Sequence, residues 1–287
     1  MGGFLSELGK NLAKQWVSLL VVPGCLFIAT VAFGLALGHR RWWEVSRATK
    51  WVTTIDTGPR GVGVLTLVLV VLLITAAAAG LLAQAIGTVV ERLWLAQRWE
   101  RWPRPIRAIA AAVTRVRAGR WTGHPDAAPR RPTWIGDRAL VPTKRVHAAY
   151  RMDLPVVWPA LWLHLPDNTR AEITSARLAY STSAALAGWG VLYVAAAAVW
   201  WPALLVVIAV WITAWVRARQ SIDTYARLIE AAVHLHSPDL ARVLGFEQEG
   251  PLTRDTGARL TYLLSARNDH HTVRDAVLEV RPQGPTG

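Results

Sequence analysis

Three stretches of the chain carry no charged residue. They cover residues 15–38, 61–90 and 178–216 and are 24, 30 and 39 residues long. A helix of about 20 apolar residues crosses the hydrocarbon core of a bilayer. The first two stretches therefore each predict one membrane-spanning helix, at about 16–38 and 62–90. This pattern excludes an ordinary soluble domain and a disordered chain.

The third stretch is long enough for two spans. Trp200, Trp201 and Pro202 lie near its midpoint. Proline is favoured in the first turn of a helix, and tryptophan is enriched where a span meets water. We therefore predict a transmembrane hairpin over 178–217 that turns at these residues. The expected fold is all-α, with four spans and both termini on the same side of the membrane.

Loop charge orients the predicted spans. The segment 91–177 holds 16 Lys and Arg against 7 Asp and Glu, whereas the loop 38–60 holds five against two. Positively charged loops stay in the cytoplasm. The segment 91–177 and both termini are therefore predicted to lie inside, in a multi-pass protein of the bacterial inner membrane. Seven tryptophans are expected to anchor the interfaces: Trp42, Trp43, Trp51, Trp94, Trp99, Trp200 and Trp201.

Small residues gather at the end of the second span. Gly80, Ala83 and Gly87 recur at helical spacing, with Gln84 beside them. Small side chains let two membrane helices approach closely. These four residues are candidates for helix packing or for lining a pore, and the packing partner is either another span of the chain or a second copy.

The segment after the second span is basic and periodic. The span is predicted to continue as a helix to Trp102, and residues 104–121 show apolar positions at a period near 3.6 against an arginine face. Such a helix commonly lies on anionic lipid. The basic residues follow the membrane boundary and form no nucleic-acid motif, so no nucleic-acid partner is expected. The candidate lipid-headgroup contacts are Arg92, Arg98, Arg104, Arg107, Arg115 and Arg117.

The remaining parts are predicted to be short cytoplasmic helices and loops. A Pro-rich strap is expected over 123–142, with helix resuming at Lys144. The apolar patch from Trp158 to Trp162 is too short to cross a bilayer. A Thr169–Glu172 capping box is expected to start the helix leading into the third span. The segment 218–280 is predicted to form C-terminal helices, with a stop at Ser237-Pro238, and 281–287 to be a disordered tail.

Residues 130–245 resemble a family of uncharacterised bacterial membrane proteins. The resemblance rests on Pro132-Thr-Trp-Ile-Gly-Asp137, on Tyr150-Arg-Met-Asp153, on Trp158-Pro-Ala-Leu with Leu165-Pro166, and on Leu235-His-Ser-Pro-Asp-Leu240. The family pattern has Asn where this chain has Asp137, Gly where it has Met152, and Arg after the histidine. The resemblance implies a topology, a strap followed by a span pair, and no activity.

Catalytic motifs are scarce in the sequence. It contains no phosphate-binding loop, no dinucleotide fingerprint, no His-Glu-x-x-His and no Gly-x-Ser-x-Gly. His234 and His236 are two residues apart, so on a helix they point in different directions and are poorly placed to share a metal. We expect no catalytic or metal residues, no cofactor and no enzyme activity.

The features together favour a homo-oligomeric channel or pore. The spans carry no charge, small residues offer a packing face, and Arg92 and Arg98 are candidates for the pore mouth. The layout of two spans, a large cytoplasmic segment and a hairpin resembles bestrophin-type anion channels in topology alone. The alternative is a membrane-anchored scaffold or signalling protein whose cytoplasmic region recruits a soluble protein.

Overall fold

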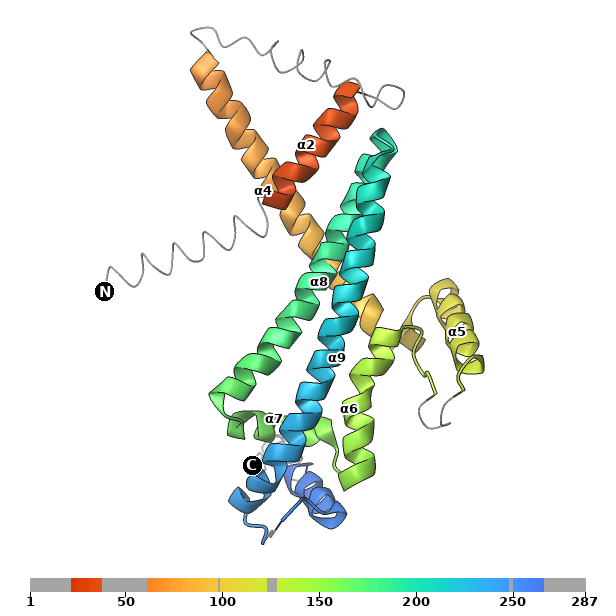
Figure 1. Cartoon of the computed structure of the whole chain (residues 1–287), viewed down its shortest axis with the longest axis vertical. Helices are drawn as coiled ribbons and strands as arrows, with labels where there is room; N and C mark the ends of the chain where they lie inside the picture. The colour runs from red at the N-terminus through yellow and green to blue at the C-terminus, as the bar shows by residue number, and fades with distance from the viewer. Residues whose placement is uncertain (1–21, 38–60, 98, 123–127, 248–249, 266–287) are drawn as a thin grey trace, which may run out of the picture. The chain divides into compact units, whose positions relative to one another are not determined.

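The computed structural model describes residues 22–37, 61–97, 99–122, 128–247 and 250–265 of the chain. Every regular element in these ranges is a helix, so the all-α prediction is confirmed (Figure 1). In chain order the elements are α2 (Val22–Leu37), α4 (Gly61–Leu95), the 3-10 turn η2 (Trp99–Arg101), α5 (Arg104–Gly119), α6 (Trp134–Tyr150), α7 (Leu154–His164), α8 (Asp167–Val199), α9 (Ala203–Val243) and a helix over 254–265.

Three of these helices are long and apolar enough to cross a membrane, namely Thr66–Leu95 of α4, α8 and α9. The chain is thus built as a multi-pass membrane protein. The predicted first span, 16–38, lies partly outside the described residues, and its described part, α2, has 16 residues. The four-span count therefore stays a prediction. The predicted turn at Trp200 to Pro202 is confirmed, because α8 ends at Val199 and α9 begins at Ala203.

The chain divides into two compact units. The first unit contains the described residues up to 97 together with 179–219, and the second contains residues 98–178 together with the described residues from 220 onward. Two long helices, α8 and α9, each supply one part to either unit.

Small residues hold the first unit together. The buried face of α4 consists of Ala76, Gly80, Ala83, Gly87, Val90 and Trp94, spaced alternately by four and three residues. A side chain at Gly87 would lie 2.7 Å from the Cα of Ala185, and one at Gly188 would collide with the carbonyl of Ala83. The backbones of α4 and α8 therefore touch, which is how spans associate where lipid removes the hydrophobic drive. The predicted small-residue face is a packing face within one chain.

Aromatic side chains close the hairpin end of the first unit. Phe27 of α2 meets the ring of Tyr193 on α8 edge-on, with centroids 5.4 Å apart. Tyr193 belongs to a small buried cluster with Ala203 and Val207 of α9. These contacts join α2 to both arms of the hairpin.

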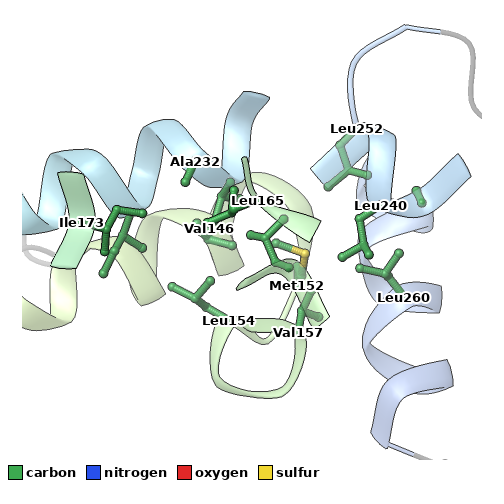
Figure 2. Packing of buried hydrophobic residues seen from close by; sticks show 14 residues of the cluster. Val146, Met152, Leu154, Val157, Leu165, Ile173, Ala232, Leu240, Leu252 and Leu260 are labelled. Atoms are coloured by element: carbon green, nitrogen blue, oxygen red, sulfur yellow. The ribbon is translucent and has the colours of Figure 1, made fainter. Parts of the chain in front are cut away.

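The second unit has an apolar core of large side chains. Figure 2 shows this core, to which α6, α7, α8, α9 and the helix over 254–265 all contribute. Val157 and Leu161 of α7 are fully buried in it, so the apolar patch around Trp158 and Trp162 belongs to a short helix that packs on this core. The helix over 254–265 joins the core through Leu260 and is tied to the start of α7 by a hydrogen bond from the Asp153 amide to the Thr261 hydroxyl (3.0 Å).

A ladder of polar contacts joins α6 and α9. Its rungs are Arg138 with Asp223 (2.5 Å), Arg145 with Glu230 (2.9 Å), and the Tyr150 hydroxyl with Nδ1 of His234 (2.5 Å). The partners are 85, 85 and 84 residues apart, so the two helices run parallel in a constant register. His234, considered from the sequence as a metal ligand, is thus hydrogen-bonded to a tyrosine.

Two predicted breaks fall inside helices. α6 begins at Trp134, ten residues before the predicted start at Lys144, and includes Pro142; α9 continues through Pro238 to Val243. A proline inside a helix removes one backbone hydrogen bond, which packing can offset. Pro142 is itself buried, and Val233 and Leu240 on either side of Pro238 lie in the core. Burial therefore overrides the local signal at both sites.

Two helix boundaries also differ from the predicted ones. α4 stops at Leu95, not at Trp102, because the fully buried Ala96 adopts a left-handed backbone (φ 45°). α8 begins at Asp167, before the predicted cap at Thr169, and the Thr169 amide donates to the side chain of Asn168 (2.8 Å). α9 itself ends at Val243, close to Gly245, which has φ 86°, and the Phe246 amide donates to the carbonyl of Ala241 (3.1 Å).

Candidate functional site

A polar groove lies between α4 and α8 in the first unit. It has a volume of about 250 Å³. Four of its lining residues bear an amide or a hydroxyl and lie in the stretches without charge. The groove is lined by Gln84, Gly87, Thr88 and Glu91 of α4 and by Ser181, Thr182, Ala185 and Trp189 of α8.

The small-residue crossing positions this groove. Ala83 and Gly87 are buried against α8, and each is followed by a polar residue, Gln84 or Thr88. One residue turns a helix by about 100°, so the polar side chains stand at the rim of the crossing. Ser181 lies one helical turn before Ala185 on α8 and provides the opposite wall. Close backbone approach and a polar rim thus arise from adjacent residues of α4.

Polar groups in this groove are costly inside a membrane. The Gln84 side chain is exposed, and no hydrogen bond joins its amide to the part of the chain that the structure describes. The Thr88 hydroxyl donates to the carbonyl of Ala85 (2.7 Å), as spanning helices commonly arrange. An amide facing hydrocarbon without a partner costs several kcal/mol, roughly 4–8 in a fully apolar solvent. Water or another polar surface must therefore meet Gln84 if this part of α4 lies in the bilayer.

The chemistry of the groove is that of neutral oxygens with one carboxylate. Hydroxyl and amide oxygens can replace part of the hydration shell of an ion or hold a file of water. Glu91 lies at the end of the groove where the stretch without charge stops, and it interacts within the structure. Its carboxylate would set the sign of charge at that end.

The grouping of Ser181, Thr182 and Thr88 with Gln84 was not predicted. Of these four residues, only Gln84 was a candidate from the sequence, and the sequence did not show which two helices come together. A usable signal was present, because Gln84 and Thr88 are four residues apart and directly follow Ala83 and Gly87. Polar residues adjacent to a small-residue face mark the rim of a helix crossing.

The candidate lipid contacts divide into two groups. Arg92, Arg104, Arg107 and Arg115 are exposed, and Arg98 lies outside the described residues. The predicted amphipathic helix is confirmed as α5, and its apolar face is open: Ile109, for example, is 66% exposed. Arg117 differs, because its guanidinium binds Asp137 and the carbonyl of Arg131.

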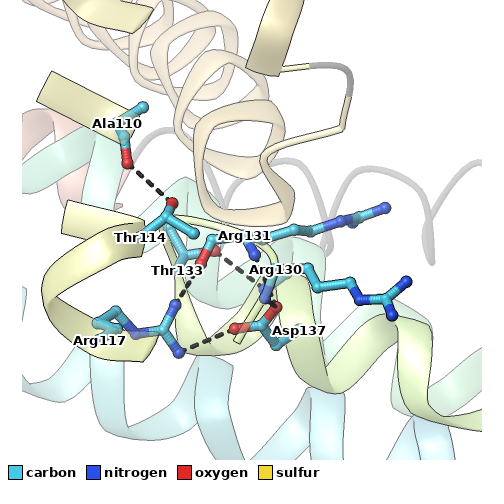
Figure 3. A network of polar contacts seen from close by, with 8 residues as sticks. Ala110, Thr114, Arg117, Arg130, Arg131, Thr133 and Asp137 are labelled. Atoms are coloured by element: carbon cyan, nitrogen blue, oxygen red, sulfur yellow. Dashed lines mark hydrogen bonds and ion pairs between the residues drawn. The ribbon is translucent and has the colours of Figure 1, made fainter. Parts of the chain in front are cut away.

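Arg117 and Asp137 join the end of α5 to the start of α6 (Figure 3). The Asp137 carboxylate accepts the backbone amides of Arg130 (3.0 Å) and Arg131 (2.8 Å) at one oxygen and meets Arg117 (2.9 Å) at the other. The Thr133 side chain caps α6 by accepting the amide of Gly136 (3.0 Å). The motif Pro132-Thr-Trp-Ile-Gly-Asp137 therefore forms the N-terminal cap of α6, and the Asp137 carboxylate stabilises this cap.

Positive charge exceeds negative charge around Asp137. Burial lowers the pKa of Lys144, and the nearby Arg130 and Arg131 lower it further, against the opposing effect of Asp137. Burial also lowers the pKa of Arg131, again against Asp137. The single Asp137 carboxylate thus neutralises only part of the positive charge of these neighbouring cations.

The predicted tryptophan anchors fall in different places. Trp42, Trp43 and Trp51 lie outside the described residues. Trp201 is exposed and Trp99 and Trp200 are half-buried, whereas Trp94 is buried and meets Trp215 edge-on at 5.7 Å. Trp94 therefore packs α4 on α9 within the first unit and does not face open headgroups.

No group of three or more His, Cys, Asp or Glu side chains with metal-site geometry occurs in the described ranges. His270 and His271 lie outside these ranges. Compared with protein-family models, with curated proteins and with solved structures, the chain matches none. The argument for a function therefore rests on the geometry of the chain itself.

Proposed function

We propose that this chain is the subunit of a homo-oligomeric channel in the bacterial cytoplasmic membrane, with both termini inside. The polar groove is the observation that carries the proposal. It places Gln84 and Thr88 opposite Ser181 and Thr182 within segments that are otherwise apolar. We infer that copies arranged around an axis turn these side chains toward a common water-filled path.

An oligomer can provide hydrogen-bond partners for the exposed Gln84 amide that a single chain in lipid lacks. Lipid offers no hydrogen-bond partner, so spanning segments turn polar groups toward protein or toward a water-filled cavity. The small-residue face of α4 is already used by α8, so it does not serve as the contact between copies. The groove side of α4 and α8 is then the surface that faces the axis.

Charge at the cytoplasmic end would tune conduction. Arg92 is exposed on α4 directly after the groove residue Glu91, whereas Arg98, the next basic residue in the sequence, lies outside the described residues. Rings of charge at a pore mouth concentrate ions of the opposite sign. We propose that the arginines attract anions and that Glu91 moderates this preference.

The exposed amphipathic helix supports a membrane-surface role for α5. Ile106, Ile109, Val113 and Val116 leave an apolar face open, and Arg104, Arg107 and Arg115 remain available to anionic headgroups. A helix with this division lies in the interface with its apolar face among the acyl chains. We propose that α5 rests on the bilayer.

Ion flux from proteoliposomes tests the channel directly. Purified full-length protein should run as an oligomer in native mass spectrometry and should release chloride or potassium from anionic liposomes. Gln84→Leu should reduce the flux at least tenfold, whereas Gln97→Leu, the same change at an exposed position in the turn after α4 and outside the groove, should not. A monomer without flux would refute the proposal, as would an equal flux from both variants.

A scaffold is the second candidate. It is favoured by large apolar side chains that the second unit leaves exposed, among them Leu163 (78%) and Tyr262 (76%). Under this alternative Leu163→Asp abolishes co-purification of one defined protein while Gln84→Leu has no effect. Flux that depends on Gln84 would decide against the scaffold as the main function.

A further inference from the structure

The second unit contains a pocket at the point where α8 enters its charge-free stretch. The pocket has a volume of about 440 Å³, within the range of small-molecule sites. α7, α8 and α9 each contribute to it. We call it the Arg177 pocket. It is lined by Trp158, Pro159, Trp162, Ile173, Thr174, Arg177, Leu178 and Tyr225.

The walls of the Arg177 pocket are mostly hydrocarbon and aromatic ring. Trp158 and Trp162 stand one turn apart on α7, with ring centroids 5.7 Å apart and planes tilted by 42°. Ile173 and Leu178 continue the apolar surface on α8. Such a surface favours an alkyl chain, at roughly 25 cal/mol for each Å² of apolar area removed from water.

One cation, one phenol and one aliphatic hydroxyl, on Arg177, Tyr225 and Thr174, supply the polar part of the lining. Arg177 is the single charged residue among the eight lining residues, and none of the eight is acidic. The Tyr225 hydroxyl lies in the same pocket. A guanidinium is a geometric match for a carboxylate or phosphate, with which it forms short charge-assisted hydrogen bonds.

The sequence places this pocket at the membrane boundary. Arg177 is the last charged residue before the 39-residue stretch without charge, and Leu178 is the first residue of that stretch. Tryptophans concentrate at the same level of a bilayer, between headgroups and acyl chains. A ligand with an acidic head and an alkyl tail occupies this level.

We propose that the Arg177 pocket binds an anionic lipid. The acid group meets Arg177 and Tyr225, and one acyl chain lies along Trp158, Trp162 and Leu178. A free fatty acid and an anionic phospholipid share this chemistry. The site involves none of the groove residues, so it stands independently of the channel.

Native mass spectrometry of the full-length protein in a steroid-based detergent measures this binding. Three probes share a twelve-carbon chain: dodecanoate, dodecanol and dilauroyl phosphatidylglycerol. We expect saturable binding of the acidic probes and at least tenfold weaker binding of dodecanol. Saturation by dodecanoate alone identifies a free fatty acid as the ligand, and saturation by the phosphatidylglycerol identifies a bilayer lipid. Equal binding of dodecanol and dodecanoate would overturn the proposal.

Variants localise the binding to the pocket. Arg177→Gln should weaken acidic-probe binding about tenfold, Arg177→Lys should weaken it less, and Thr174→Trp should block the chain while keeping the cation. Arg242→Gln, which alters an exposed arginine paired with Asp239 in the same unit, is the matched control. Circular dichroism verifies that each variant folds. Unchanged binding in folded Arg177→Gln and Thr174→Trp, or inorganic phosphate displacing dodecanoate at equal concentration, would contradict the assignment.

Discussion

The two units of this protein are held together by different means. In the first unit, α4 and α8 meet where glycine and alanine let their backbones touch. In the second unit, large side chains such as Leu161 and Met152 fill a core, and a ladder of ion pairs fixes α6 against α9. The same two helices, α8 and α9, take part in both arrangements.

The packing of the first unit is of the kind that association in lipid favours. Lipid is as apolar as leucine, so large side chains gain little by leaving it, and close packing becomes the main stabilising term. In water, burial of large apolar groups is favourable, and the exposed ends of ion pairs are solvated. The outward apolar residues of α4, such as Leu67 and Ile74, are accordingly left exposed, whereas leucines of α7 are divided between core and surface.

The largest effect should come from removing a core side chain of the second unit. Leu161→Ala opens a cavity among fully buried neighbours and should cost about 2–5 kcal/mol of stability. Leu163→Ala, two residues away on the exposed side of α7, should cost far less. Hydrogen–deuterium exchange of the full chain reads each unit separately. Equal loss of protection in the two variants would show that the core is not packed as described.

A smaller effect is expected from enlarging a residue at the helix crossing of the first unit. Gly188→Val places a side chain against the Ala83 carbonyl, so α4 and α8 must separate, at about 1–3 kcal/mol. Gly63→Val is the control, because a side chain there meets open space. Thermal unfolding in detergent should show a lower midpoint for Gly188→Val than for Gly63→Val. A midpoint unchanged from wild type would mean that α4 and α8 do not touch at this point.

The sequence was most informative where a pattern spans many residues. A 39-residue stretch without charge, interrupted at Trp200 to Pro202, predicted the hairpin and its turn correctly. The amphipathic helix α5 followed equally well from its period. These features depend on the solvent around a helix, and the pattern of apolar and charged residues in every helical turn reflects that solvent.

Features that depend on distant partners could not be predicted in this way. Pro142 and Pro238 indicate breaks locally, and the burial that keeps both helices intact comes from other elements. The α6–α9 ladder joins residues 84 or 85 positions apart, with no local sign of the pairing. The polar groove and the Arg177 pocket likewise arise from separate helices, and only the adjacency of Gln84 and Thr88 to small residues hinted at the groove.

The smallest effect concerns charge, which distinguishes the units once more. Lys144 carries a lowered pKa because burial and the neighbouring arginines disfavour its charged form. The unfolded chain then binds more protons than the fold, so stability rises as the pH passes upward through the lowered pKa toward the usual value for lysine. Removing this charge should therefore stabilise the second unit at neutral pH.

Lys144→Gln should raise the stability of the second unit at neutral pH by about 0.5 kcal/mol, the scale of interactions between partly exposed charges. The gain should shrink as the pH rises, because wild-type Lys144 then loses its proton, and it should also shrink in high salt, which screens the arginines. Arg259→Gln breaks an exposed pair with Asp255 and should give no gain. Hydrogen exchange from the first unit should respond to neither change, since Lys144 and Arg259 both lie in the second unit. A gain that is independent of pH would show that Lys144 acts through packing and not through repulsion.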